Sequence, residues 1–338
     1  MASHSSASKR VAEERSVFSQ MFPPAPPFTE KDLPSLSGKV ILITGATSGV
    51  GLSLAKIVYT HGASVKITGR SSDKIELALR EIRNAEKIHE SGNVEGFIFD
   101  LADLASLKEA AAKFLKVTQR LDVLVHNAGV MKPPKGSKTK LGHDLEMGTN
   151  CLGPYLLNHF LEPILLKTAA SAQANSVRIL WVASLVAVGT TQDGIRFDEK
   201  SGNPQALSNP MEHYMQSKVG NIFLASETGK RLKDTGIINL SLHPGLLKTE
   251  LNRHAPKIQQ RIMSAFLKPS MYGAYTELFA ALSPEIKTED NGAFIVPWGN
   301  FSAIPGHIEK GMRSEKEGGT GLAVTFVAWC EREVAQYK

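Results

Sequence analysis

The chain has 338 residues, of which 42% are hydrophobic, so it can bury a sizeable core and is expected to fold as a globular protein. No apolar run approaches the ~18 residues that span a bilayer, and the N-terminus lacks the apolar segment of a signal peptide. The formal charge is +6, but the basic residues are dispersed and not interleaved with aromatic residues, which argues against a nucleic-acid partner. The two cysteines, Cys151 and Cys330, have neither a disulfide pattern nor a metal-ligand spacing. We therefore expect a cytoplasmic protein with no metal site and no transmembrane segment.

Residues 1–36 are polar and then proline-rich, which predicts an N-terminal extension outside the main fold. Residues 9–22 mix charged and apolar side chains and are expected to include a short helix. A docking arm is the favoured interpretation, and contact with a membrane surface is the alternative.

The first expected strand, residues 40–43, is a continuous aliphatic run of the kind found in buried parallel strands. It leads directly into a glycine-rich stretch and then a helical pattern. Glycines let the backbone turn tightly and approach a pyrophosphate, while the helix N-terminus supplies N–H donors. A simple tight turn is the alternative, but the strand–turn–helix context favours a dinucleotide site. Its expected cofactor-binding residues are Gly45, Thr47, Ser48, Gly49, Val50 and Gly51.

The second expected strand, residues 64–68, ends before Arg70. A site that prefers NAD usually has an acidic residue at this strand end to bind the ribose hydroxyls. A guanidinium instead pairs with a phosphate, so Arg70 predicts NADP(H), with hydroxyls of Ser48 and Ser71 as further donors. A surface arginine at a helix start is the alternative.

A helix over residues 74–87 and a strand over 96–99 follow, and the strand leads to Asp100 and Leu101, which we expect to contact adenine. Asp103 is expected to cap a helix that runs to residue 120. The next strand, residues 121–125, leads to small residues that let a cofactor lie across its carboxyl end. These are Asn127, Ala128 and Gly129.

A long helix over residues 145–166 carries Asn150, a poor residue for the middle of a helix unless its amide is used. The alternative is a buried amide bonded to backbone. Strand 177–183 then ends at Ser184, whose hydroxyl is expected to point into the same crevice.

After a loop over residues 189–209, Tyr214 and Lys218 stand four residues apart, on one face of a helix. A nearby positive charge is expected to lower the pKa of the phenol. Ordinary helix surface is the alternative for this pair.

Strand 237–242 leads to a turn that is expected to close over a nicotinamide, with Thr249 bonding its carboxamide and His243 structural. The predicted cofactor contacts of this turn are Pro244, Gly245, Leu247 and Thr249. Residues 250–269 are expected to form a helical lid, followed by helix 272–282 and strand 293–296. We divide the chain into the extension 1–36, a single domain 37–305 that holds both cofactor and substrate sites, and a C-terminal helical tail 306–338.

Taken together, these motifs resemble a classical short-chain dehydrogenase/reductase over residues 36–305. The motifs that carry the resemblance are Thr44-Gly45-x-x-x-Gly49-x-Gly51, Asp100, Asn127-Ala128-Gly129, Asn150, Ser184, Tyr214-x-x-x-Lys218 and Pro244-Gly245. Local stretches such as Val296-Pro297-Trp298-Gly299 are similar to the retinol-dehydrogenase-like branch, especially its fungal members. The resemblance implies an α/β fold with a single Rossmann-type, doubly wound parallel sheet and helices on both faces.

The resemblance also implies the roles of the catalytic residues. Tyr214 is the general acid or base, Lys218 lowers its pKa and binds the nicotinamide ribose, and Ser184 polarises the substrate oxygen. Asn150 holds a water that relays protons. His126 and Ala183 depart from the commonest family pattern without removing any of these groups.

The expected activity is an NADP(H)-dependent interconversion of an alcohol with its ketone or aldehyde, possible substrates being retinoids, steroids, lipid aldehydes and secondary-metabolite ketones. An apolar substrate is favoured because several aliphatic residues are expected to line the crevice, namely Leu185, Val186, Val188, Leu246 and Leu247. Family members commonly form homodimers or homotetramers. A non-catalytic NADP(H)-sensing protein on the same fold is the alternative function. The glycine spacing disfavours a sugar-nucleotide epimerase of the extended type.

Overall fold

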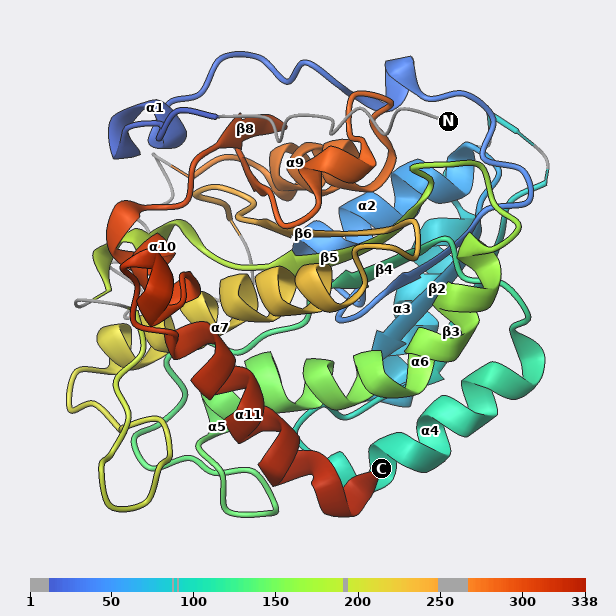
Figure 1. Ribbon diagram of the computed structural model, residues 1–338. Coiled ribbons are helices and arrows are strands. Elements are labelled where there is room, and N and C mark those ends of the chain that lie inside the picture. Colours follow the sequence, from blue (N-terminus) through green and yellow to red (C-terminus); the bar gives the residue numbers. More distant parts are fainter. Residues whose placement is uncertain (1–11, 87, 90, 191–193, 249–266) are drawn as a thin grey trace, which may run out of the picture.

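The computed structural model describes residues 12–86, 88–89, 91–190, 194–248 and 267–338 (Figure 1). Within these residues, eight strands form one sheet in the order β3-β2-β1-β4-β5-β6-β7-β8. The strands are β1 Val40–Ile43, β2 Ser64–Gly69, β3 Asn93–Ile98, β4 Val123–His126, β5 Val177–Val182, β6 Ile237–Leu242, β7 Phe294–Val296 and β8 Asn300–Ser302. All neighbouring pairs are parallel except β7 with β8.

The central strands are buried on both faces, which explains their continuous apolar sequences. Every residue of β4, β5 and β6 is buried, as are the last three residues of β1. Parallel strands need helical crossovers that cover both sides of the sheet, so neither face of a central strand meets water.

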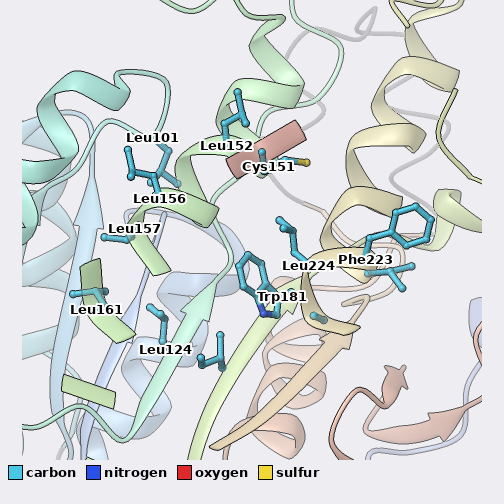
Figure 2. Close-up of a cluster of buried hydrophobic side chains, with 14 of the residues drawn as sticks. Leu101, Leu124, Cys151, Leu152, Leu156, Leu157, Leu161, Trp181, Phe223 and Leu224 are labelled. Atoms are coloured by element: carbon cyan, nitrogen blue, oxygen red, sulfur yellow. The ribbon is translucent and has the colours of Figure 1, made fainter. Parts of the chain in front are cut away.

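Helices cover both faces of the sheet, as the resemblance implies. The longer helices are α2 Gly49–Thr60, α3 Ser72–Arg83, α4 Leu104–Val117, α6 Gly153–Ala169, α7 Pro210–Arg231, α9 Ser270–Leu282 and α11 Leu322–Val334. One core lies between the sheet and helices α2, α3 and α9. The other lies between the sheet and helices α4, α6 and α7, with α11 outside α7 (Figure 1). Figure 2 shows part of this second core, where Trp181 of β5 lies beside Leu224 of α7. The predicted doubly wound fold is confirmed.

Several predicted elements differ in detail from the observed ones. The helix expected over residues 145–166 is α5 Leu145–Met147, a π-helical turn η2 Gly148–Leu152, and then α6. Strand β8 and helix α10 Gly306–Met312 were not predicted, because their sequences lack clear periodicity. Asp103 stands at the N-cap of α4, but its side chain makes no capping bond and instead pairs with Lys140, so that prediction is wrong. The expected lid over residues 250–269 lies mostly outside the described residues.

The C-terminal helix α11 packs directly on α7. Phe326 is fully buried, and its ring centroid lies 6.3 Å from that of Phe223 in an edge-to-face arrangement. A Cβ on Gly220 of α7 would lie 2.7 Å from the Phe326 ring, so close approach of the two helices depends on glycine there. This contact supports the helix that carries Tyr214.

We predict that Phe326→Ala destabilises the protein by about 3–5 kcal/mol, because it removes a buried ring and leaves a cavity between α11 and α7. Urea unfolding followed by circular dichroism measures the change. The control is Val324→Ala on the same helix, where the side chain is 57% exposed and the expected change is within about 0.5 kcal/mol. Equal stability of the two variants would show that α11 does not support α7.

Candidate active site

A cavity of about 600 Å³ lies at the carboxyl ends of the parallel strands. This is the usual ligand crevice of a doubly wound sheet. Most of the predicted site residues line it, namely Gly45, Thr47, Ser48, Gly49, Val50, Arg70, Asp100, Leu101, Asn127, Ala128, Gly129, Ser184, Tyr214, Lys218, Pro244, Gly245 and Leu247. Gly51 and Asn150 lie outside the lining, and Thr249 lies outside the described residues.

The turn between β1 and α2 is shaped for a phosphate group. Gly45 and Gly49 have φ of +67° and +61°, values that other residues rarely adopt. A Cβ on Gly45 would lie 2.8 Å from Cα of Ala128, and one on Gly51 would lie 2.5 Å from Nδ2 of Asn127. Gly51 is therefore a packing residue, whereas the start of α2 faces the cavity with its N–H groups. The turn fits the diphosphate of a dinucleotide.

Two cations stand at the rim of the cavity beyond β2. Arg70 follows the last residue of β2 and is exposed, and Lys74 lies in the first turn of α3. Lys74 was missed from the sequence, where its place in the first turn of the helix after β2 was the available signal. Asp100, across the cavity, accepts a hydrogen bond from the Ala102 backbone N–H at 3.1 Å, which fixes the direction of its carboxylate.

Tyr214 and Ser184 both line the cavity, and the Ser184 hydroxyl lies near enough to the phenol to influence its pKa. Tyr214 is 4% exposed and lies in α7, whereas Ser184 follows β5 by two residues. Nζ of Lys218, one turn further along α7, donates to the carbonyl of Val182 at 2.9 Å and lies 5.8 Å from the centroid of the Tyr214 ring. The structure thus brings three of the four predicted catalytic residues to one point.

The pKa of Tyr214 moves in the opposite direction from the one we expected. Burial raises it above its ordinary value, the hydrogen bond from Ser184 lowers it, and nearby Glu146 raises it further. Burial also lowers the pKa of Lys218 to about 8. Burial therefore dominates the net pKa of the phenol, and the lowering by Lys218 that the family resemblance implies stays a prediction.

Asn150 lies behind the cavity wall in the π-helical turn η2. Its Oδ1 accepts from the Val130 N–H at 2.8 Å, and its Nδ2 donates to the Val130 carbonyl at 3.0 Å and to the Ser217 hydroxyl at 2.9 Å. A Cβ on Gly129 would lie 3.2 Å from Oδ1 of Asn150 and 3.3 Å from Nζ of Lys218. Asn150 therefore connects the segment after β4 to α7, and that segment lines the cavity.

Sequence reasoning missed a cluster of three ionisable residues beside the site, Asp144, Glu146 and His213. Glu146 is 2% exposed, and its Oε1 accepts from the Lys132 backbone N–H at 2.7 Å. Nε2 of His213 lies 2.8 Å from Oδ1 of Asp144. Nδ1 of His213 accepts from the N–H of Leu207 at 3.4 Å. One ligand atom of each of the three residues lies within 4.8 Å of those of the other two, and none of the three lines the cavity.

Five aliphatic residues were expected in the crevice. Val186, Leu246 and Leu247 line the cavity, whereas Leu185 is buried and Val188 is half-buried away from the lining. Leu185, Val186 and Val188 belong to the short helix η3 Leu185–Gly189. Because a helix points successive side chains in different directions, only Val186 of these three lines the cavity.

Comparison with known proteins agrees with this geometry. A sequence model of the family described as "short chain dehydrogenase" matches residues 39–192. A short-chain dehydrogenase/reductase of Phomopsis amygdali is 40% identical over 329 residues, which cover 96% of this chain and 97% of that protein. The chain belongs to the short-chain dehydrogenase/reductase family.

A second fungal member of the family, the short-chain dehydrogenase/reductase bet4 of Neocamarosporium betae, is 39% identical over 95% of this chain and 94% of its own. Among solved structures, a putative uncharacterised protein of Mycobacterium paratuberculosis superposes with a TM-score of 0.63 at 25% identity, over 91% of this chain and 97% of that one. As a short-chain dehydrogenase/reductase, the protein is an oxidoreductase that uses NAD(P)(H) and acts on a small molecule. Within the described part of the chain, no helix has the length and apolarity needed to cross a membrane.

Glu146 yields a pH-dependent prediction, because burial raises its pKa from 4.5 to about 7. Between these two values the folded protein holds a proton that the unfolded chain releases, so stability should fall as pH rises from 4.5 to 7. Glu146→Gln, which keeps an oxygen for the Lys132 N–H, should flatten this dependence. Burial raises the pKa of Glu277 in α9 to about 8, so part of the slope should remain. Urea unfolding at several pH values measures it, and an unchanged slope in the variant would refute the assignment.

Proposed function

We propose that this protein is an NADP(H)-dependent oxidoreductase that interconverts an alcohol with its ketone or aldehyde. The observation that carries the proposal is that the hydroxyl-bearing residues Tyr214 and Ser184 line the same cavity as the glycine turn between β1 and α2. A pair of hydroxyls in a dry site can hold and protonate a carbonyl oxygen. We assign both the cofactor and the substrate sites to residues 37–305.

In carbonyl reduction, Ser184 donates a hydrogen bond that orients the substrate oxygen, and Tyr214 gives that oxygen its proton. A nicotinamide held in the cavity would supply the hydride for the carbonyl carbon. The raised pKa of Tyr214 keeps the phenol protonated at neutral pH, which suits a proton donor. Lys218, with a pKa of about 8, and Asn150 are the groups that we propose return a proton to Tyr214 through bound water. The same groups serve alcohol oxidation in reverse.

Two cations favour NADP(H) over NAD(H). Arg70 and Lys74 stand where β2 meets α3, beside the part of the cavity that would hold the adenosine ribose. A 2′-phosphate there would pair with the guanidinium, while no carboxylate directly follows β2 to bind a free 2′-hydroxyl. Asp100 and Leu101 are proposed to contact the adenine.

The substrate is proposed to be apolar next to its carbonyl group. Beyond the reacting hydroxyls the cavity wall is formed by Met131, Val186, Met211, Leu246 and Leu267. Methionine side chains adapt to irregular shapes, which suits a medium-sized apolar molecule. The chain is expected to act as a homodimer or homotetramer, the common states of the family.

Replacement of Tyr214 by Phe removes only the hydroxyl that transfers the proton. Turnover should fall by about 10³-fold, the scale of general acid catalysis, while the affinity for NADPH changes little. Absorbance of NADPH with an active carbonyl substrate measures turnover, and fluorescence titration measures binding. The matched control is Tyr155→Phe, since the Tyr155 hydroxyl bonds Glu331 away from the cavity. Normal turnover in the Tyr214 variant would refute the mechanism.

Replacement of Arg70 by Asp places a carboxylate where we expect the 2′-phosphate. The preference for NADPH over NADH should fall by ten- to a hundredfold, about the value of a charge-assisted hydrogen bond. The ratio of kcat/KM for the two cofactors measures it. Arg80→Asp makes the same charge change on the exposed side of α3 and should leave the ratio unaltered. An unchanged ratio in the Arg70 variant would remove the case for NADP(H).

A screen of aldehydes and ketones with NADPH separates the enzyme from the alternative, a cofactor-sensing protein. The enzyme should oxidise NADPH with at least one apolar carbonyl compound. Tight NADPH binding without oxidation by any compound of a broad panel would favour the sensor.

A further inference from the structure

The N-terminal arm, which we define as residues 12–22, runs along the antiparallel edge strand of the sheet. The Ala303 N–H donates to the carbonyl of Glu13 at 3.1 Å. Arg15 donates from its backbone N–H to the Ser302 hydroxyl at 3.1 Å, from Nε to the Phe301 carbonyl at 3.2 Å, and from Nη2 to Asn300 Oδ1 at 3.1 Å. These bonds join the arm to β8 and hold the short helix α1 Val17–Met21 in one place.

One side chain of the arm enters the core of the domain. Gln20 is 3% exposed, whereas its neighbours Phe18 and Phe22 are 73% and 54% exposed. Oε1 of Gln20 lies 2.7 Å from Nε2 of His243, a residue 223 positions away in the sequence. Its Nε2 donates to the carbonyl of Arg15 at 2.6 Å. The arm thus buries a polar group and leaves its aromatic groups outside.

The hydrogen bonds around His243 have only one consistent direction. Nδ1 of His243 accepts from the backbone N–H of Gly245 at 3.2 Å, so this nitrogen carries a lone pair. The ring proton then sits on Nε2 and is donated to Oε1 of Gln20. The amide of Gln20 is oriented by its own bond to Arg15. Burial lowers the pKa of His243 to about 3, so the imidazole stays neutral and Nδ1 remains an acceptor at neutral pH.

Gly245 belongs to the turn that lines the cavity after β6. It has a φ of +90°, and a Cβ there would lie 2.8 Å from the ring of Trp298. Two contacts therefore hold the turn that contains Gly245. It packs against the Trp298 ring, and its Gly245 N–H is bonded to His243. Its neighbours Pro244, Leu246 and Leu247 also line the cavity, so a small movement of the turn changes the shape of the site.

We propose that the N-terminal arm is a positioning element of the cofactor site, in which Gln20 selects the Nε2–H tautomer of His243 and His243 holds the Gly245 turn. The inference rests on the nucleotide binding proposed above. Gln20 and His243 are positioning residues, because neither lines the cavity. A role in stability alone would leave cofactor affinity unaltered, which separates the two explanations.

The test is Gln20→Met, which keeps the length of the side chain but removes both its acceptor and its donor. The affinity for NADPH should fall about tenfold, and KM for NADPH should rise in parallel, while kcat stays within about twofold, because Tyr214, Ser184 and Lys218 are untouched. Fluorescence titration and steady-state kinetics give these values, and thermal unfolding is recorded alongside. Hydrogen exchange of the peptide that contains Gly245 should become faster.

Two further variants complete the experiment. Phe18→Ala, on the same helix, removes an exposed ring and should bind NADPH as the wild type does. Arg15→Met removes the two side-chain bonds of Arg15 to β8 and loosens the arm there, so it should weaken binding in the same direction as Gln20→Met but by less. If Gln20→Met does not fold, Arg15→Met decides the question.

Wild-type affinity for NADPH in both Gln20→Met and Arg15→Met would overturn the inference, even if their melting temperatures were lower. If the wild type bound neither NADPH nor NADH, the proposed function and this inference would both fail. Normal wild-type binding with unaffected variants would overturn the inference alone.

Discussion

The bond between the Lys218 ammonium and the Val182 carbonyl is the contact on which the geometry of the site depends. Val182 is the last residue of β5, and Asn221 donates to the same carbonyl at 2.8 Å. Two side chains of α7 are thereby fixed to the end of one strand. Tyr214 stands one turn earlier on α7, and Ser184 two residues beyond β5, so this attachment brings the two hydroxyls together. A buried amine is costly without such an acceptor.

Burial brings the pKa values of this amine and of two nearby carboxyl groups close to one another. The pKa of Lys218 falls to about 8, while that of Glu146 rises to about 7 and that of Glu277 to about 8. Each carboxyl favours the charged form of Lys218, and each is kept partly protonated by its own burial. Near neutral pH the protonation states of these three groups are therefore coupled to one another.

Two segments at the ends of the chain support opposite sides of the cavity. Helix α11 packs on α7 through Phe326 and the space left by Gly220. The N-terminal arm binds β8 and reaches His243 through Gln20, which acts on the turn after β6. Helix α7, which carries Tyr214, and the turn after β6 thus both contact residues outside the central sheet. A site between rigid strands gains precision when the loops that close it are bonded in this way.

The sequence by itself determined the fold and the identity of most lining residues, because these follow from local patterns. The aliphatic run of β1, the glycines before α2 and the four-residue spacing of Tyr214 and Lys218 act over a few positions. Only the tertiary structure decided the direction of the Tyr214 pKa, which depends on burial by distant segments. It also decided the pairing of Gln20 with His243 and the place of Glu146 beside the site. Hydrogen bonds and desolvation act through space, so residues far apart in the chain decide them.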